Sequence, residues 1–312
     1  MKVSIVMLAY NHERFIEQAL DSVLMQETEY EYELIVGEDC SKDCTREIVK
    51  RYEEKFQGRM SPLYRDKNLG MIKNLLDCLT HCTGEYIAML EGDDFWTDCG
   101  KLQKQVDFLE THSEYAACVH NWNIVSACNA FIRKGFEEDS AHDYTLQDVE
   151  SFALPAQTST LIVRNIFQEA KEKYYRTLVW FLWMPMDRIA VLLMLQYGKI
   201  LVLPEVMSTY HYYIEENGSN WSSAHEVESK QNYLYFFMMA LGLERLAGKL
   251  GSPISMVNEK VRLFRESRRA RSWSKRRKWL WLQGILMILA EPHRVSFLKK
   301  IQEDRVRKPS VR

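Results

Sequence analysis

The sequence predicts an α/β protein, with a mostly parallel sheet carrying helices on both faces and a helical C-terminal region after it. Three observations lead to this fold class. Short apolar runs alternate with segments of helical spacing over the N-terminal third of the 312 residues. Each of four such runs ends in a polar or acidic turn. After about residue 223, only the helical spacing remains.

The predicted elements follow one another in strand–helix order. The first strand, Val3–Ala9, is almost continuously apolar, which is typical of a parallel strand buried on both faces. After it come a helix from about 13 to 25, the strand Glu33–Glu38, a helix through Ile48 and Phe56, a short strand near Leu63–Arg65, a helix through Ile72 and Leu79, and the strand that enters Glu91. The short connections favour right-handed crossovers and a parallel sheet.

An acidic cluster stands at the end of the last of these strands. Glu91, Asp93 and Asp94 repel one another, and none of them suits a half-buried strand surface. A divalent cation such as Mg²⁺ or Mn²⁺ removes the conflict, because hard cations bind carboxylate oxygens and take further ligands from water and substrate phosphate. The cluster therefore predicts a site for a metal–diphosphate. A solvated acidic turn is the alternative.

Four polar turns fall at the carboxyl ends of predicted strands: Tyr10–Asn11, Asp39, Asn68–Gly70 and Glu91–Asp94. Ligands of open parallel sheets bind beyond these ends, so we predict a nucleotide site at this edge. The sequence has no GxGxxG after the first strand and no GxxxxGK[ST], which argues against dinucleotide and P-loop sites.

Three motifs together resemble those of the family 2 glycosyltransferases with the GT-A fold. They are Val3–Asn11, the turn Glu38–Ser41 and the stretch Glu91–Trp96. The resemblance is close over roughly residues 1 to 125 and looser to about 225. It implies an inverting transfer of a sugar from a nucleotide-diphosphate donor, with a UDP-sugar favoured, in the manner of enzymes that build bacterial surface polysaccharides.

The resemblance also implies roles for individual residues. Leu8, Tyr10 and Asn11 are expected around the base, and Asp39 on the uracil or its equivalent. Asp93 and Asp94 are expected on the ribose and the metal, which is Mn²⁺ or Mg²⁺, without a choice between the two residues. Glu91 stands where relatives usually carry the first Asp of the motif, and Asn68 and Gly70 complete the expected donor-nucleotide site.

Asp187 is the candidate catalytic base. It falls in the first turn of a predicted helix behind Pro185, where inverting relatives carry an Asp at the equivalent helix. The alternative is an acidic residue favoured there by the helix dipole. Ser219 and Trp221 resemble a family loop that closes over the donor diphosphate, and His211 is expected to be an ordinary surface histidine.

The segment Gln157–Asn165 is predicted to be a strand. In the family such a strand floors the acceptor side, and Thr158–Thr160 are candidates to line that pocket, although β propensity alone explains the pattern equally well. Trp122–Val125 and Phe131–Ile132 predict a hairpin before it.

Charge is distributed unevenly along a chain of formal charge −2. From Glu259 onward there are 17 Lys and Arg against 5 Asp and Glu, and the apolar, Trp-rich run Trp279–Ala290 lies within this stretch. Such a run is too short to span a bilayer, but a basic helix beside it can lie on an anionic membrane surface. The alternative is that this helix packs on the rest of the protein or on another subunit. No recognition motif for nucleic acid accompanies the basic residues.

These observations predict a cytoplasmic protein, peripheral on the inner face of the cell membrane. The seven cysteines show no zinc spacing and are expected as reduced thiols, and neither a signal peptide nor a membrane-spanning run is recognised. The expected domains are a glycosyltransferase domain over 1–222, with a nucleotide-sugar half over 1–125 and an acceptor half over 126–222, and a helical region over 223–312.

The predicted function is a metal-assisted single displacement onto a hydroxyl of a saccharide or lipid-linked saccharide, with Asp187 as base. Two alternatives remain: a membrane-associated scaffold whose site has decayed, and a sugar nucleotidyltransferase on a similar fold. The turn Tyr10–Glu13 lacks the Gly-rich, basic loop that a nucleotidyltransferase needs for a triphosphate. Donor sugar, acceptor, linkage and homo-oligomerisation are left open.

Overall fold

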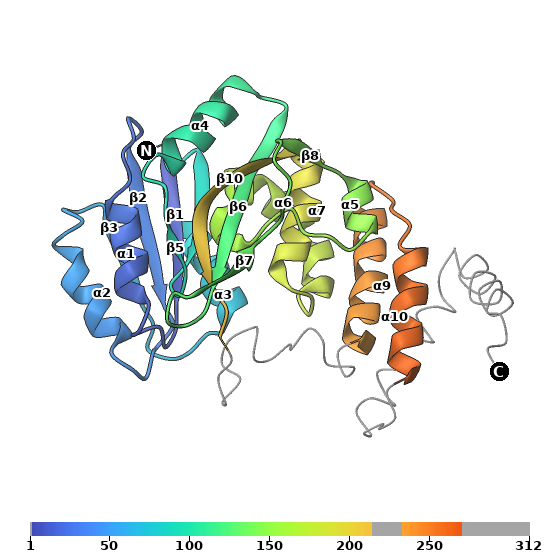
Figure 1. The fold of residues 1–312 in the computed structure, drawn as a ribbon, viewed down its shortest axis with the longest axis horizontal. Coiled ribbons are helices and arrows are strands. Elements are labelled where there is room, and N and C mark those ends of the chain that lie inside the picture. The colour runs from blue at the N-terminus through green and yellow to red at the C-terminus, as the bar shows by residue number, and fades with distance from the viewer. Residues whose placement is uncertain (1, 214–232, 270–312) are drawn as a thin grey trace, which may run out of the picture. The chain divides into compact units, whose positions relative to one another are not determined.

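The computed structural model describes residues 2–213 and 233–269, which form two compact units (Figure 1). The sheet unit comprises Met1–Thr145, Leu154–Arg176 and Ala190–Tyr213. The helical unit comprises Leu146–Ala153, Thr177–Ile189 and the part of the chain from Ile214 onward. The predicted domain boundary at 222, the loop with Ser219 and Trp221, and the run Trp279–Ala290 lie outside the described residues.

A single mixed sheet forms the centre of the sheet unit. Its strands are β1 (Val3–Ala9), β2 (Tyr32–Glu38), β3 (Met60–Tyr64), β4 (Tyr86–Glu91), β5 (Phe95–Trp96), β6 (Tyr115–Val125), β7 (Phe131–Lys134), β8 (His142–Tyr144), β9 (Ile162–Arg164) and β10 (Lys199–His211). They are ordered β3-β2-β1-β4-β9-β6-β10-β5, with β7 paired to β6 and β8 to β10. The first four strands of this order are parallel, as are β6 and β10. β9, β5, β7 and β8 pair antiparallel to their neighbours.

Helices connect the strands of the sheet unit. They are α1 (Ile16–Leu24), α2 (Thr45–Glu53), α3 (Met71–His81), α4 (Lys101–Thr111) and α6 (Phe167–Leu178), with α7 (Met186–Tyr197) running into this unit from the helical one. Val3, Ile5 and Met7 of β1 share one core with apolar residues of α1, α2 and α4. α3 packs on β1 and β2, where Gly37 leaves room for Asn74 and Cys78. The predicted α/β fold is confirmed.

The helical unit is built around two C-terminal helices, α9 (Tyr233–Leu250) and α10 (Val257–Arg269). α5 (Leu146–Glu150) and the short 3₁₀ helix η2 (Val179–Phe181) belong to it as well. A buried ion pair joins Glu244 of α9 to Lys260 of α10, and Glu244 also accepts a hydrogen bond from the Met256 N–H at 3.0 Å. The predicted helical C-terminal region is thus present over the described residues.

Of two local predictions, one is confirmed and the other is only partly correct. The hairpin over residues 122–132 is present as β6 and β7. The strand predicted over Gln157–Asn165 is instead a 3₁₀ turn, η1 (Thr158–Thr160), followed by the short β9. Here Ser159 and Thr160 are fully buried. The Ser159 hydroxyl donates to Asp94 and the Thr160 carbonyl accepts from Gln105, and these contacts override β propensity. Within the described residues, no helix has the length and apolarity needed to cross a bilayer.

Candidate active site

The four polar turns lie at one edge of the parallel half of the sheet. The register of the parallel strands aligns the ends that precede these turns. Ala9 of β1 pairs with Glu38 of β2, Glu38 with Tyr64 of β3, and Leu8 of β1 with Glu91 of β4. Because these strands run in the same direction, the turns that follow them emerge side by side (Figure 1). The edge therefore gathers polar groups from four separate stretches of the chain.

Hydrogen bonds join the turns after β1 and β2. Asn11 adopts a left-handed backbone conformation with φ of 58°, which Asn tolerates better than most residues. Its N–H donates to Ser41 Oγ at 3.0 Å, and its side-chain oxygen accepts from the Lys42 N–H at 2.8 Å. Tyr10, immediately before it, stays partly exposed at the edge. Asn11 thus fixes the shape of the turn that presents Tyr10.

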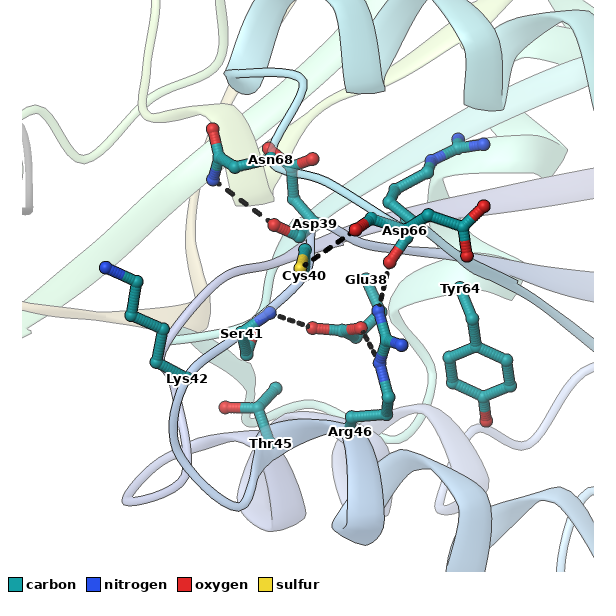
Figure 2. Close-up of polar contacts among 12 residues, drawn as sticks. Glu38, Asp39, Cys40, Ser41, Lys42, Thr45, Arg46, Tyr64, Asp66 and Asn68 are labelled. Atoms are coloured by element: carbon teal, nitrogen blue, oxygen red, sulfur yellow. Dashed lines mark hydrogen bonds and ion pairs between the residues drawn. The ribbon is translucent and has the colours of Figure 1, made fainter.

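Glu38, at the end of β2, and Arg46, in the first turn of α2, form a partly buried ion pair, as Figure 2 shows. Glu38 Oε1 accepts from the Ser41 N–H at 2.7 Å, while Oε2 pairs with the Arg46 guanidinium. Arg46 in turn donates to the Arg65 carbonyl at 2.5 Å, so the pair links the turns after β2 and β3. Sequence reasoning used Glu38 only as part of a motif and missed Arg46, whose partner lies eight residues earlier.

Asp39 holds the turn that precedes α3. One carboxylate oxygen accepts the Leu69 N–H at 2.7 Å and the other the Gly70 N–H at 2.9 Å. The Asn68 side chain returns a bond to the Asp39 carbonyl at 3.2 Å. Gly70 has φ of 80°, a conformation that favours glycine, and α3 begins after it. Asp39, Asn68 and Gly70 therefore form one hydrogen-bonded group, and each Asp39 oxygen keeps further acceptor capacity.

Gly92 brings the turn after β4 against the end of β1. Its N–H donates to the Leu8 carbonyl at 2.8 Å. A Cβ at this position would lie 2.8 Å from that oxygen and 2.8 Å from His12 Nδ1, so no larger residue fits without a shift. Leu8 itself is buried. Leu8 therefore contributes to the edge by holding the acidic turn in place through its backbone.

Asp94 is the buried member of the acidic cluster. Its Oδ2 accepts from Gln157 Nε2 at 2.5 Å and from Ser159 Oγ at 2.8 Å, and its Oδ1 accepts from the His211 N–H at 3.2 Å. Burial first, and the Asp93 charge second, raise the pKa of the Asp94 carboxyl, and the bond from Ser159 opposes this rise. Asp94 thus ties the acidic turn to η1 and to the end of β10.

Asp93 keeps its carboxylate partly exposed at the edge. Tyr213 OH donates to Asp93 Oδ2 at 3.1 Å, and His12 Nε2 lies 3.9 Å from the same oxygen. The ring of His211 donates from Nδ1 to the Asp93 carbonyl at 2.5 Å. Phe15 packs on both His211 and Tyr213. The prediction of a surface histidine is wrong for His211, because the last strand carries it into the acidic turn and buries it.

Glu91 and Asp93 carry carboxylates, the kind of ligand that a divalent cation takes. Burial and the neighbouring Asp93 charge raise the pKa of Glu91 to about 8. Within the described part of the chain, no three His, Cys, Asp or Glu side chains are grouped to hold a metal by themselves. A metal–diphosphate needs only one or two protein carboxylates, because its phosphate oxygens are ligands too. The donor set at this edge is therefore of the right kind, with Asp93 the more accessible carboxylate.

Asp187 lies in the helical unit, in the first turn of α7. Its Oδ1 accepts from the Arg188 N–H at 2.6 Å, and burial raises the pKa of its carboxyl. The Arg188 guanidinium donates to the carbonyls of Phe152 and Ala153, both at 2.9 Å, and covers the Phe152 ring. These contacts fix the helix start that presents Asp187.

Comparison with known proteins identifies the family. The model described as "Glycosyl transferase family 2" matches residues 4–169, more than half of the chain. An uncharacterized protein of Mycobacterium tuberculosis is 33% identical over 67% of this chain and 58% of its own length. The chain therefore spans less than two thirds of that relative. The Staphylococcus aureus poly(ribitol-phosphate) beta-N-acetylglucosaminyltransferase TarS is 32% identical over 36% of this chain and 19% of TarS.

Solved structures share the fold. The crystal structure of S. aureus TarS 1–349 in complex with UDP-GlcNAc matches 95% of this chain and 83% of its own, with a TM-score of 0.64 and 18% identity. The mannosyltransferase PcManGT from Pyrobaculum calidifontis, in complex with GDP-Man and Mn²⁺, matches 97% and 84%, with a TM-score of 0.51 and 17% identity. With the family model matched across the strand-end motifs, the chain belongs to glycosyl transferase family 2.

Proposed function

We propose that the chain transfers a sugar from a nucleotide-diphosphate donor, a UDP-sugar first of all, to a hydroxyl of a saccharide or lipid-linked saccharide, with inversion. One observation carries the proposal: the turns with Asn11, Asp39 and Asp93 converge at one edge of the parallel strands in a family 2 chain. Similar structures in complex with UDP-GlcNAc and with GDP-Man support a nucleotide-sugar donor.

The donor roles follow from the hydrogen bonds at the edge. Asp39 retains acceptor capacity for a base N–H, and Tyr10 is exposed enough to pack on the base. Glu91 and Asp93 are proposed to hold Mn²⁺ or Mg²⁺ with the diphosphate, and a bound cation would neutralise charge on the departing nucleoside diphosphate. We assign the metal to Asp93 rather than Asp94, because three donors already occupy the Asp94 carboxylate.

Asp187 is proposed as the base that takes the proton of the acceptor hydroxyl. A buried carboxylate with a raised pKa is a better proton acceptor near neutral pH than a solvated one. Arg188 is proposed to position it by holding the start of α7 against residues 152 and 153. The loop with Ser219 and Trp221 remains a proposal for closing over the diphosphate.

A panel of UDP-, GDP- and dTDP-sugars, each incubated with the protein and Mn²⁺, tests the proposal through release of the nucleoside diphosphate. We expect release from at least one donor, and a loss of about 10²-fold or more in Asp187→Asn with donor binding retained. Release from none of the donors would favour the scaffold. Pyrophosphate release from a nucleoside triphosphate and a sugar 1-phosphate would instead show the nucleotidyltransferase.

A further inference from the structure

Two tryptophans of the helical unit stand in solvent immediately before the helix of Asp187. Trp180, in η2, is 79% exposed and Trp183 is 45% exposed, while Phe181 and Met184 between and beside them are buried. The segment is therefore held by its inward side chains and presents its indoles outward. Two large aromatic side chains, three positions apart and both exposed, are unusual on the surface of a protein and are a candidate binding surface.

Gly242 of α9 fixes the Trp183 ring. A Cβ at residue 242 would lie 2.9 Å from Trp183 Cζ2, 3.3 Å from Cη2 and 2.6 Å from the Met184 sulfur. Only glycine lets the edge of the indole lie this close to the helix backbone. A ring held in this way loses little conformational freedom when a ligand packs on its open face, so the surface is organised in advance.

Asp187 is four positions after Trp183, so at most ~14 Å of extended chain joins their Cα atoms. A short oligosaccharide covers such a distance. We propose that Trp180 and Trp183 form the surface on which the saccharide acceptor stacks, with Trp183 beside the sugar that carries the reacting hydroxyl. The inference rests on the proposed function, since it takes Asp187 as the base.

Sugar rings suit this surface because they carry an apolar C–H face that packs on an indole, while their hydroxyl groups stay in water. A membrane surface suits it less well. Asp187 and Arg188 follow four and five positions after Trp183, so insertion of the indoles into a bilayer would carry this carboxylate and guanidinium toward hydrocarbon, at a cost. A saccharide acceptor on the indoles, by contrast, needs a carboxylate such as Asp187 nearby to take the proton of its hydroxyl.

A glycan array of defined oligosaccharides, probed in the presence of UDP and Mn²⁺, tests the inference with the full chain. We expect binding by the wild type, a loss of about tenfold or more in Trp183→Ala and a smaller loss in Trp180→Ala, with partial rescue in Trp183→Phe. Phe131→Ala is the matched control, because this ring is also exposed but lies on β7 of the sheet unit. It should bind like the wild type.

Calorimetry of UDP binding, run on the same variants, separates this inference from the proposed function. Unchanged UDP binding with lost glycan binding in the Trp variants supports the acceptor surface. Equal glycan binding in all variants, or no binding to any glycan by protein that binds UDP, overturns it. The inference is also overturned if Trp180→Ala loses binding to phosphatidylglycerol vesicles but keeps its binding to the glycan array. Trp180 is exposed, so its replacement leaves the core intact.

Discussion

Two neighbouring carboxylates at the sheet edge have opposite surroundings. Asp94 is buried and accepts three hydrogen bonds, from Gln157, Ser159 and the backbone of His211. Asp93 is partly exposed, and Tyr213 is its one hydroxyl donor among the described residues. Sequence position alone could not separate them, because the difference comes from segments far along the chain. We therefore propose a structural role for Asp94 and a ligand role for Asp93.

Replacing Asp94 by Asn should destabilise the protein more than the same change at Asp93. The amide would turn an N–H₂ group toward donors that now face a carboxylate, and a buried unsatisfied group costs about 1–3 kcal/mol. Asp93→Asn should cost less than about 1 kcal/mol, because its carboxylate is partly solvated. Urea unfolding of both variants without metal measures the difference. Equal losses would contradict the assignment.

Lys101 is a buried cation at the start of α4. Its Nζ lies 4.3 Å from the centre of the Trp96 ring and has no hydrogen-bond partner among the described residues. Desolvation lowers the pKa of Lys101 to about 7. Desolvation and, second, the charge of Lys101 also lower the pKa of the buried His120. Between the lowered pKa of Lys101 and the ordinary value of Lys, the unfolded chain holds a proton that the folded protein lacks.

Stability should therefore rise with pH from about 7 toward about 10, with Lys101 contributing up to ~1.4 kcal/mol per pH unit. Below pH 7 the lysine is charged in both states and the full cost of burying the charge applies. Lys101→Met should be more stable than the wild type at pH 7 and should show a flatter pH dependence. Unfolding in urea at pH 7 and 9.5 tests this, and parallel pH profiles for the two proteins would refute it.

At the scale of elements, strand–helix alternation predicts the order β1 to β4 and the helices between them. The hydrophobic periods there are long and regular, and each strand ends in a polar turn. The prediction of a strand over Gln157–Asn165 holds for Ile162–Arg164 and fails at Thr158–Thr160. There Ser159 Oγ accepts from the Glu91 N–H and donates to Asp94, and the Ser159 carbonyl accepts from Trp96 Nε1. Tertiary hydrogen bonds, absent from local propensity, decide that segment.

A buried ion pair joins α9 to α10. Lys260→Met leaves the Glu244 carboxylate buried beside apolar residues, and such a break costs about 3–5 kcal/mol. The double variant Glu244→Leu with Lys260→Met removes both charges and should regain most of the loss. Chemical unfolding of the full chain measures both changes. A single variant as stable as the wild type would show that the pair contributes nothing.

At the scale of the molecule, the sheet collects site residues that no sequence window contains. Gln157 and His211 reach Asp94 from 63 and 117 positions away. Sequence reasoning found the strand-end residues, because parallel strands place their carboxyl ends at one edge. It missed Arg46, whose contacts link the turns after β2 and β3. It also missed Gln157 and Tyr213, whose contacts arise when the segments around β9 and β10 join the sheet. The polar residues that interrupt the apolar stretch Lys199–His211, His211 among them, were the available signal.

Charge asymmetry belongs to the whole chain as well. The excess of Lys and Arg after Glu259 supports the proposal that the protein docks on an anionic membrane surface. Binding to phosphatidylglycerol vesicles should weaken as salt is raised and should fall when Arg271, Lys275, Arg276, Arg277 and Lys278 are all changed to Gln. Vesicle co-sedimentation of the full chain measures this. Binding that ignores both salt and the substitutions would exclude electrostatic docking.

Calorimetric titration with UDP, with and without Mn²⁺, tests the donor site most directly. The wild type should bind UDP more tightly with Mn²⁺, Asp93→Asn should lose this metal-dependent gain, and Asp139→Asn, the same change at an exposed position, should keep it. Asp93→Asn that binds UDP as the wild type does, with the same response to Mn²⁺, would contradict the metal assignment. A wild type that binds none of UDP, GDP and dTDP, with or without metal, would contradict the account of the site.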